Sequence, residues 1–440
     1  MEKKRYALVG VGGRSRMFTN AINGDFAGMA ELVGLCDVNP GRMELRNNDF
    51  AEAGKPRLPM YAAEDFDKMV KETRPDTVIV TTRDCFHDEY ICRALELGCD
   101  AITEKPMTTD EKKCLRIMET ARRTGKEVRV TFNYRYSPPR TQVKELLMEG
   151  TIGEILSVDF SWMLNTRHGA DYYRRWHRNK ANSGGLMVHK ATHHFDLVNW
   201  WLSAYPTEVF AMGERKFYRP ESAEHMGLQG RGERCLDCPV SDRCKFFLDL
   251  KNTEGLRKMY LENEQYDGYF RDRCVFGADI DIEDTMNVVV RYNTGAYMSY
   301  CLNSFCPWEG YRLAINGTKG RLEQQTVETV YISGDGTVPG ETIKKGTHIR
   351  IFPHFADAYE VELRVAKGGH GGGDSPLLEG LFSPNPPDDP LKRAADWVEG
   401  AYSILTGVCA NRSMATGLPV KVDEMVPGLP EPDFPEMKGW

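Results

Sequence analysis

The stretch 6-YALVGVGGRSRMF-18 places Gly10, Gly12 and Gly13 between an apolar run and a segment of helical character. A strand that turns through glycines into a helix presents backbone N–H groups and the positive end of the helix to a phosphate. The spacing departs from Gly-x-Gly-x-x-Gly, because Ser15 stands where the third glycine is expected. The stretch predicts a dinucleotide-binding unit, with an ordinary glycine-rich turn as the alternative.

A second apolar run, 32-LVGLCDVNPGR-42, ends in Asp37 at the distance expected for a carboxylate that binds the adenosine ribose. A carboxylate at this place repels a 2′-phosphate, so NAD is favoured over NADP. Arg14 and Arg42 lie close enough in the sequence to weaken that preference. The predicted cofactor contacts in these two runs are Gly10, Gly12, Gly13, Arg14 and Asp37.

Composition limits the class of protein. With 440 residues and 41% hydrophobic content, the chain is long enough for two buried cores. A net charge of -7 and a pI near 5.9 provide no basic surface for a nucleic acid. The sequence shows no run of about 20 apolar residues and no signal peptide. We therefore expect a cytoplasmic protein that binds neither nucleic acid nor membrane.

The pattern of strands changes along the chain. Up to about residue 133, β-rich runs alternate with helical stretches, as in a parallel sheet covered by helices; these runs are 5–9, 31–37, 76–82, 100–104 and 127–133. After Pro138-Pro139, which begins a helix, the runs 155–164, 285–292 and 296–303 lack intervening helices, so we expect them to pair antiparallel. The predicted domains are 1–133 and 134–440, with an apolar helix after Ala395 and an extended proline-rich tail from Pro427.

The stretch 104-EKPMTTDE-111 ends another apolar run. Pro106 restricts Lys105 to an extended conformation and so fixes the direction of its side chain. The preceding strand run ends in 78-VIVTTRDCFHDEY-90 at the same edge of the sheet, where such folds bind ligands. We expect Thr81, His87, Glu104 and Lys105 at the cofactor, with Lys105 beside the nicotinamide. A solvated Glu-Lys pair before a helix is the alternative.

These residues resemble the Gfo/Idh/MocA (glucose-fructose oxidoreductase and inositol dehydrogenase) family. The match covers the glycine loop and the stretches 36–42, 78–106, 130–155 and 183–201, and Glu-Lys-Pro is its most specific part. The resemblance implies an NAD-binding Rossmann domain, followed by an α/β domain with a large, mostly antiparallel sheet. It also implies oxidation or reduction of sugars, polyols or their derivatives with NAD or NADP, and a catalytic role for Lys105. Asp84 and His189 depart from the family pattern, which often has Asn and Asp there.

The stretch 189-HKATHHFD-196 carries the predicted acid–base chemistry. On one helix, His189, His193 and Asp196 would share a face. His193 is the predicted base for the hydroxyl proton, since histidine titrates near neutral pH, and Lys105 would polarise the same oxygen. His189 could form a hydrogen bond with the substrate or with His193, and a core or capping role is the alternative. Asp196 could contact the substrate, and a role in fixing the helix is the alternative. A metal bound by His189 and His193 is a further alternative.

Two other segments are candidates for substrate binding. The stretch 167–185 concentrates arginines, aromatics and histidines, a composition suited to sugar hydroxyls and to a carboxylate or phosphate, and Tyr172, Arg175 and His177 are its predicted contacts. An ordinary polar loop is the alternative. The glycine-rich stretch 367-KGGHGGGDSP-376 presents His370 and Asp374. The sequence of this stretch alone is typical of a flexible linker. The family resemblance suggests instead that the stretch closes over the substrate and that His370 contacts the substrate.

Four cysteines form a separate cluster, Cys235, Cys238, Cys244 and Cys274. Their number and spacing suit tetrahedral zinc better than an iron–sulfur cluster, and reduced or paired cysteines without metal are the alternative. Relative to the short members of the family, this region near 233–275 is an insertion with a predicted stabilising role.

Three functions follow as hypotheses. The first is an NAD-dependent oxidoreductase that transfers hydride to or from a sugar, polyol or derivative. The second is a glycosidase that uses bound NAD for transient oxidation and elimination, and the third is a non-catalytic NAD-linked sugar sensor. We also expect a homodimer or homotetramer, because one face of an open antiparallel sheet needs a cover.

Overall fold

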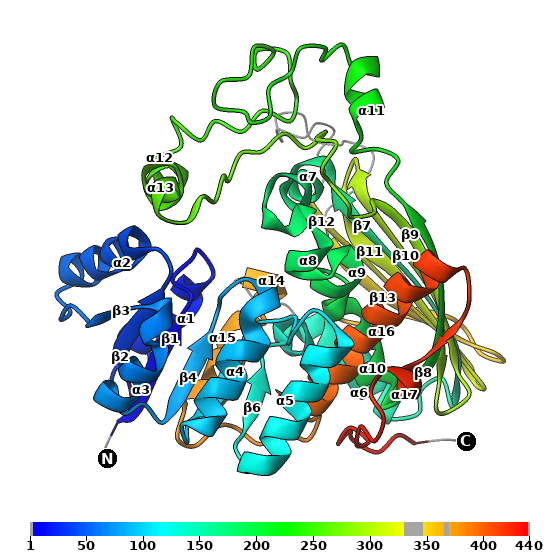
Figure 1. The fold of residues 1–440 in the computed structure, drawn as a ribbon. Coiled ribbons are helices and arrows are strands. Elements are labelled where there is room, and N and C mark those ends of the chain that lie inside the picture. The colour runs from blue at the N-terminus through cyan, green and yellow to red at the C-terminus, as the bar shows by residue number, and fades with distance from the viewer. Residues whose placement is uncertain (1–2, 330–345, 365–368, 439–440) are drawn as a thin grey trace.

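The computed structural model describes residues 3–329, 346–364 and 369–438, apart from the side chains of 369 and 370. Two β-sheets organise the chain, one in an N-terminal α/β unit and one in the part that follows (Figure 1). A long insertion, residues 215–284, lies above both sheets in this view. The prediction of a Rossmann domain followed by a domain with a large antiparallel sheet is confirmed.

The first sheet has seven strands in the order β15-β6-β5-β4-β1-β2-β3. The five predicted runs all form strands and pair in parallel; they are β1 (Lys4–Val9), β2 (Ala30–Asp37), β4 (Thr77–Val80), β5 (Asp100–Thr103) and β6 (Val128–Val130). β3 (Met60–Ala62) adds an edge. Helices connect the strands: α1 (Ser15–Asn23), α2 (Pro40–Glu52), α3 (Phe66–Thr73), α4 (His87–Glu96) and α5 (Glu111–Thr124), with short turns η1 (Ala63–Asp65) and η2 (Asp84–Phe86). The strand order reverses between β1 and β4, which places a ligand-binding crevice at their carboxyl ends.

The second sheet has nine strands in the order β14-β13-β12-β11-β7-β10-β9-β8-β16. The strands are β7 (Ile155–Asn165), β8 (Pro206–Glu214), β9 (Thr285–Tyr292), β10 (Tyr297–Cys306), β11 (Glu309–Gly317), β12 (Gly320–Thr329), β13 (Gly346–Pro353), β14 (Tyr359–Glu360) and β16 (Val420–Lys421). All neighbours pair antiparallel except β7 and β10, which are parallel. The expectation that the runs 155–164 and 296–303 pair antiparallel is therefore wrong.

That exception has a topological cause. Four helices follow β7, namely α7 (Thr166–Arg174), α8 (Lys180–Ser183), α9 (Gly185–His189) and α10 (Thr192–Leu202), with η4 (Trp176–Arg178) between the first two. The prediction that no helices separate these strands is wrong. A helical crossover brings the chain back in the original direction, which a hairpin cannot do.

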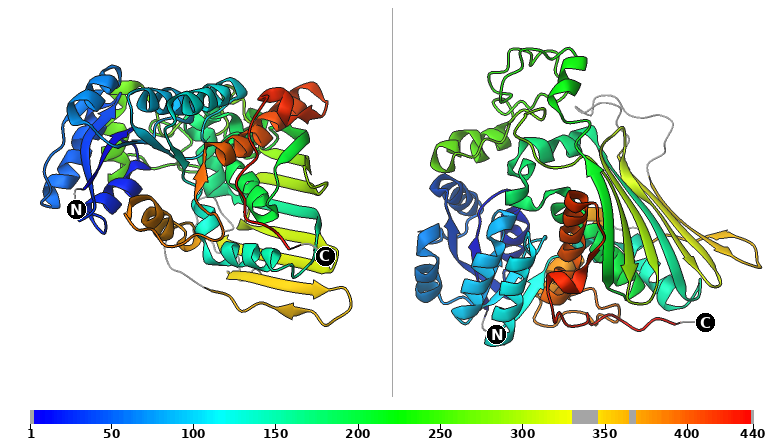
Figure 2. Two further views of the ribbon diagram at one scale, coloured as in Figure 1. Left: turned by 90° about the horizontal axis from the view of Figure 1, so that it is seen from below. Right: turned by 45° about the vertical axis from the view of Figure 1, so that its right-hand side comes forward.

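Helix α16 (Trp397–Thr416) lies between the two sheets, drawn in red in the right-hand view of Figure 2. Its side chains from Val398 to Ala410 are almost all buried, and Asp396 and Glu399 form a capping box at its start. β15 (Ala395–Asp396), just before it, pairs antiparallel with β6 of the first sheet. Among the described residues, no helix has the length and apolar character needed to span a membrane.

The remaining elements flank these sheets. η3 (Asn133–Tyr136) and α6 (Pro138–Met148) join the two parts of the chain, and α14 (Gly369–Gly372) and α15 (Asp374–Phe382) pack near them. α17 (Val422–Met425) follows β16. Residues 215–284 form the insertion between the paired strands β8 and β9, with α11 (Pro220–His225), α12 (Glu254–Met259), η5 (Leu261–Asn263) and α13 (Glu264–Asp267). In Figure 1, α12 and α13 lie over α2 of the N-terminal unit.

Candidate active site

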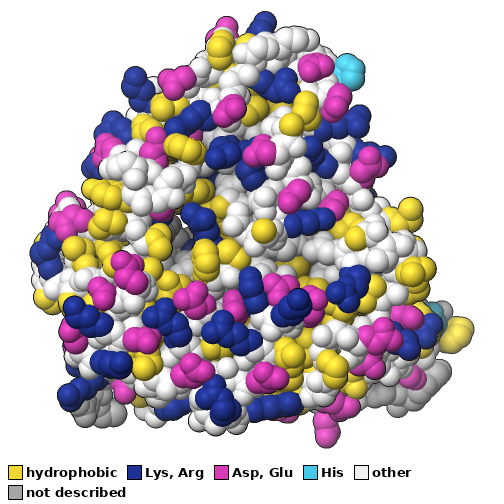
Figure 3. All heavy atoms as spheres, in the orientation of Figure 1, with side chains coloured by type: hydrophobic (Ala, Val, Ile, Leu, Met, Phe, Trp, Pro, Cys, Tyr) yellow, Lys and Arg dark blue, Asp and Glu magenta, His cyan; other side chains and the backbone are white. Residues whose placement is uncertain are grey.

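A cavity of about 1110 Å³ lies where the carboxyl edge of the first sheet, the helices after β7, the second sheet and the insertion meet. Figure 3 shows the surface hollowed between the insertion and the N-terminal unit. Ligand pockets usually measure roughly 300–1,000 Å³. The cavity therefore has room for a dinucleotide and a second small molecule.

The glycine loop forms one end of this cavity. Gly10 has φ +89°, and a Cβ there would lie 2.5 Å from the backbone of Thr81 and Thr82, so only glycine fits. A Cβ on Gly12 would meet no atom within 4 Å. The hydroxyl of Ser15, the missing third glycine, is turned back and donates to the carbonyl of Gly12 at 2.7 Å. The loop keeps the open backbone that a pyrophosphate requires, so these residues fit NAD.

Asp37 lies at the end of β2 on the same cavity wall. Its carboxylate accepts backbone N–H groups from Val11 and, at 2.8 Å, from Asn39. Burial raises the pKa of Asp37, and these two hydrogen bonds oppose that shift. The carboxylate is thus held rigidly at the position predicted for the ribose.

The other predicted cofactor residues also border the cavity, but several already have protein partners. Arg14 donates to Glu104 at 2.7 Å. The Thr81 hydroxyl donates to the carbonyl of Gly10. His87 contacts the carbonyls of Pro106 at 2.8 Å and Thr82 at 3.3 Å, so its ring ties together the loops after β4 and β5.

Lys105 follows β5 and reaches the segment 189–196. Its Nζ donates to the backbone carbonyl of His189 at 3.1 Å, and its peptide bond to Pro106 is cis. Burial and the nearby charge of Lys190 lower the pKa of Lys105 to about 8. Lys105 borders the cavity, and its role at the nicotinamide stays a prediction.

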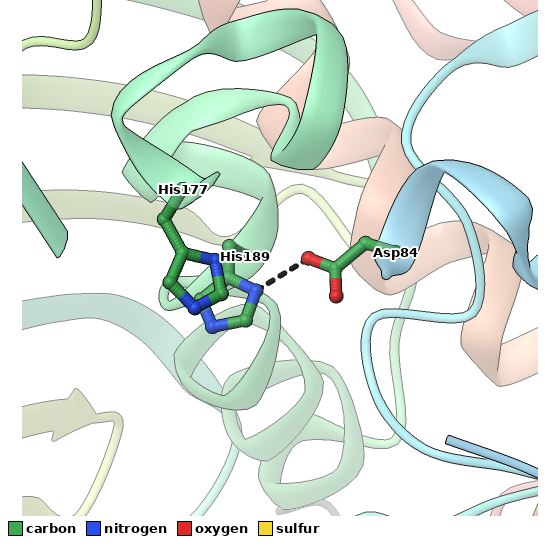
Figure 4. Close-up of side chains that lie close together, drawn as sticks. All are labelled: Asp84, His177 and His189. Atoms are coloured by element: carbon green, nitrogen blue, oxygen red, sulfur yellow. Dashed lines mark hydrogen bonds and ion pairs between the residues drawn. The ribbon is translucent and has the colours of Figure 1, made fainter. Parts of the chain in front are cut away.

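Asp84, His177 and His189 meet in the cavity (Figure 4). Lys105 is close enough for its charge to act on all three. Nδ1 of His189 and Oδ2 of Asp84 form a short hydrogen bond. The rings of His177 and His189 lie 3.9 Å apart between centroids. Such an Asp–His pair fixes the ring orientation and stabilises a proton taken up at Nε2. His189, paired with Asp84, is therefore a candidate general base.

Electrostatics favour the uncharged ring in the resting site. Burial lowers the pKa of His189 well below its usual value, and His177 and Lys105 lower it further. Burial, and then the charge of Arg175, likewise lower the pKa of His177. For Asp84, burial raises the pKa, while Lys105 and Arg175 oppose that shift. A neutral imidazole beside a carboxyl group can accept one proton from a substrate hydroxyl.

The predicted single helix carrying residues 189–196 is not present. α9 ends at His189 and α10 begins at Thr192, so His189 and His193 do not share one helical face. The break is held by α16, whose Ser403 contacts the hydroxyl and the carbonyl of Thr192. His193 still borders the cavity, with its ring stacked on Tyr134 at 4.1 Å between centroids.

The alternative of a metal bound by His189 and His193 does not match the geometry. Within the described residues, the only group of three or more potential ligands whose atoms all lie within 4.8 Å is Asp84, His177 and His189. His193 is outside it.

Glu309, His168 and Tyr172 form another hydrogen-bonded chain at the border of the cavity. Nδ1 of His168 contacts Glu309 at 2.6 Å, and its Nε2 contacts the Tyr172 hydroxyl at 3.1 Å. Glu309 and His168 were not predicted from the sequence. Since Glu309 is at the start of β11, far along the chain, only the fold reveals this connection.

Two further cations, Arg175 and Lys190, face the site. Lys190 is 4% exposed, contacts the Tyr134 hydroxyl at 3.3 Å and lies 5.0 Å from the ring centroid of Trp162. Within the described parts of the chain, neither cation has an ion-pair partner. Lys190 was not predicted as a site residue, and Arg175 was.

Asp196 lies away from the cavity. It is 1% exposed, does not border the cavity and pairs with Arg135 through contacts of 2.6 and 2.9 Å. This placement favours the alternative, in which it fixes α10. The side chain of His370 is outside the described residues, and Asp374 begins α15 instead of lying on a loop, where it accepts from Asn133 at 2.7 Å.

The four predicted metal-binding cysteines line one small cavity in the insertion. Their thiols are free, and they do not form a group with all atoms within 4.8 Å. Among the described residues, the four sulfur atoms are thus not gathered as tightly as a zinc site requires, although Cys238 accepts a backbone N–H from Gly232 at 3.3 Å.

The fold joins a dinucleotide-binding Rossmann unit to a second unit with a large sheet, and the cavity lies between them. The family model "Oxidoreductase family, NAD-binding Rossmann fold" matches residues 4–132, and "Oxidoreductase family, C-terminal alpha/beta domain" matches residues 144–422. The chain belongs to the Gfo/Idh/MocA oxidoreductase family, as the sequence motifs predicted.

Three known proteins show the range of similarity. "Putative oxidoreductase YteT" of Bacillus subtilis (strain 168) is 38% identical over 96% of this chain and 98% of its own length. "Glycosyl hydrolase family 109 protein 1" of Akkermansia muciniphila is 29% identical over 43% of this chain and 41% of its own. The structure of an oxidoreductase from Agrobacterium radiobacter, in complex with NAD+, L-tartaric acid and magnesium, has a TM-score of 0.64 at 16% identity, over 97% of this chain and all of the other. This last likeness concerns the fold.

Proposed function

We propose that the protein is an NAD-dependent oxidoreductase that acts on a CH–OH group of a carbohydrate. The observation that carries this proposal is the common cavity, which has the glycine loop and Asp37 at one end and Lys105 with the Asp84–His189 pair at the other. A bound NAD would accept the hydride in this cavity.

The protein's own groups would handle the proton. Nε2 of His189 accepts the hydroxyl proton while Asp84 stabilises the resulting imidazolium. Lys105 in its charged form donates a hydrogen bond to the same oxygen and stabilises the negative charge that develops there. His193, the base predicted from the sequence, lines the substrate side and is the alternative base.

The charges around the site support an acidic sugar as substrate. Lys105, Arg175 and Lys190 lie close together near Asp84, and among the described residues none of the three forms an ion pair, which is costly for a buried cation. A uronate carboxylate would compensate them, with Tyr172 and His177 at sugar hydroxyls. A screen of NADH formation with neutral sugars, polyols and uronic acids tests this proposal. Turnover of neutral substrates alone would reject the acidic class, and no NADH formation from any CH–OH substrate would reject the redox function.

A second candidate function is an NAD-dependent glycosidase, favoured by the similarity to the family 109 glycosyl hydrolase. Its reaction returns the hydride at the end of each turnover. Cleavage of a chromogenic glycoside without accumulation of NADH would support it, whereas steady NADH formation with free sugar would support the first function. A non-catalytic sensor would show neither.

The Asp84, His177 and His189 group also has the composition of a divalent metal site. The hydrogen bond between Nδ1 of His189 and Oδ2 of Asp84 leaves Nε2 of His189 able to accept a proton, so we assign the pair to proton transfer. Activity that survives dialysis against EDTA supports this assignment, and activity restored only by a divalent cation opposes it.

For the insertion, we propose that zinc draws Cys235, Cys238, Cys244 and Cys274 together. The shared small cavity and the backbone N–H bonds to Cys235, Cys238, Cys244 and Cys274 support this idea. Elemental analysis that finds less than about 0.2 zinc per chain would reject it.

Two further proposals concern organisation. We propose that the domains divide at residue 133, and that β15 from the C-terminal part completes the first sheet by pairing with β6. We also propose a homo-oligomer that covers the open face of the second sheet, where Phe210, Met212 and Val289 are 37%, 69% and 50% exposed. A monomer in analytical ultracentrifugation at micromolar concentration would reject this proposal.

A further inference from the structure

The insertion at residues 215–284 reaches across the nucleotide end of the cavity. It connects two neighbouring antiparallel strands, β8 and β9, which need only a short turn. Instead, α12 and α13 extend to α2, as Figures 1 and 2 show. A long ordered connection of this kind is usually functional.

Three polar contacts join the insertion to the N-terminal unit directly after Asp37. Arg42 and Asp267 form an ion pair of 2.7 Å, with side chains only 9% and 5% exposed. Nε of Arg42 donates to the carbonyl of Met259 at 3.4 Å, and Nδ2 of Asn39 donates to the carbonyl of Asn263 at 2.9 Å. A buried ion pair with supporting hydrogen bonds fixes one relative position of the two elements.

The insertion also supplies side chains to the cavity. Tyr260, Tyr266, Asp267 and Tyr269 line it together with the glycine loop and Asp37. The Tyr260 hydroxyl is 3.3 Å from the position that a Cβ on Gly13 would occupy, so it stands opposite the pyrophosphate loop. Tyr260 and Tyr269 also lie 5.7 and 5.6 Å from the guanidinium of Arg42.

Among the described residues, a buried nitrogen of Arg42 in this wall lacks a hydrogen-bond partner. Nη2 of Arg42 is buried and has no hydrogen-bond partner among the described residues, although Nη1 and Nε are used. A buried donor of this kind is expected to meet a ligand acceptor. A ribose oxygen is suitable, because Asp37 and Asp267 together outweigh the charge of Arg42 and repel a 2′-phosphate.

We infer that residues 254–271 of the insertion form a second wall of the adenosine-binding site, closed by the Arg42–Asp267 pair, and that this wall retains NAD between turnovers. The inference rests on the proposed NAD cofactor. Tyr260 and Tyr269 contact the adenosine half, Asp267 neutralises Arg42, and the dinucleotide leaves only when the contacts to α2 open.

The test measures cofactor release without any substrate. NADH is bound to the purified full-length protein, followed by energy transfer from tryptophan, and displaced with excess NAD+. Asp267→Asn and, as a second variant, Tyr260→Ala should each raise the dissociation rate constant at least tenfold, and Asp267→Glu should restore most of the retention. Asp279→Asn is the matched control, because Asp279 lies in the same insertion, is 57% exposed and pairs with Arg178 away from the cavity.

A second measurement concerns cofactor choice. Asp267→Asn releases Arg42, so the affinity for NADP relative to NAD should rise at least fivefold. Dissociation rates within twofold of the unmodified protein for both Asp267→Asn and Tyr260→Ala, with saturable NADH binding, would overturn the inference. No saturable NADH binding by the unmodified protein would instead overturn the proposed cofactor, and the inference with it.

Discussion

Asp84→Asn is the sharpest test of the proposed proton acceptor. The substitution keeps the size of the side chain but removes its negative charge from beside Nδ1 of His189. An amide would donate a hydrogen bond to Nδ1 and so place the ring proton on Nε2, the atom that must accept the substrate proton. The base would then be in the wrong tautomer.

The expected size follows from the geometry. Two opposite charges about 4 Å apart attract by about 4 kcal/mol at an effective dielectric constant of about 20. Loss of that attraction for the imidazolium would slow the proton transfer by up to about 1,000-fold, at about 1.4 kcal/mol per decade. Since Lys105 and Arg175 already oppose the imidazolium, we expect a fall in kcat of about 100-fold or more, with the Kd for NAD unchanged.

Two assays check this prediction. Turnover is followed by NADH absorbance on the best substrate from the screen, and nitrogen-15 NMR of histidine-labelled protein reports the tautomer of His189, assigned with His189→Asn. Asp88→Asn is the control, because Asp88 is also buried but pairs with Arg116 outside the cavity. A kcat above one third of the original value, or an unchanged His189 tautomer, would refute the reasoning.

The remaining predictions concern Lys105, His193, Lys190 and Lys144. The pKa of Lys105 is lowered to about 8, so its charge is present below pH 8 and lost above it. We therefore expect kcat to decline as pH rises through about 8, and Lys105→Arg to move this decline to higher pH. A rise in activity through pH 8 would instead indicate that the neutral amine of Lys105 is the base. His193→Ala should lower kcat much less than His189→Ala, and the opposite order in the same NADH assay would return the role of base to His193. Lys190→Met should raise the KM for a uronic acid at least tenfold and change the KM for a neutral analogue less than threefold. Equal changes in the two KM values would exclude a contact between Lys190 and the substrate carboxylate. Lys144 is buried, and burial lowers its pKa to about 6, below its value in the unfolded chain, so the wild-type protein gains stability as pH rises above 6. Lys144→Met should therefore raise the melting temperature most below pH 6. If the difference in melting temperature between variant and wild type, measured by calorimetry, does not shrink toward pH 9, this prediction is contradicted.

The order and type of most elements could be predicted from local sequence. Continuous apolar runs bounded by polar residues identify buried parallel strands, and all five such runs before residue 133 form strands. β3 was missed because its three residues, Met60–Ala62, carry no clear period. The glycine loop, Asp37 and Lys105 could be placed at one sheet edge, since the carboxyl ends of parallel strands share that edge by topology.

The proposed catalytic arrangement could be found only from the tertiary structure. The sequence by itself determined the family, the dinucleotide-binding edge and a histidine-rich segment, because these depend on neighbours along the chain. Only the fold decided that α16 interrupts the segment at Lys190, that His189 pairs with Asp84 from another domain, and that Asp196 pairs with Arg135. Only the fold brings Asp267 of the insertion to Arg42 beside the nucleotide site. Contacts between residues more than 60 positions apart depend on how the elements pack, and local periodicity contains no record of that packing.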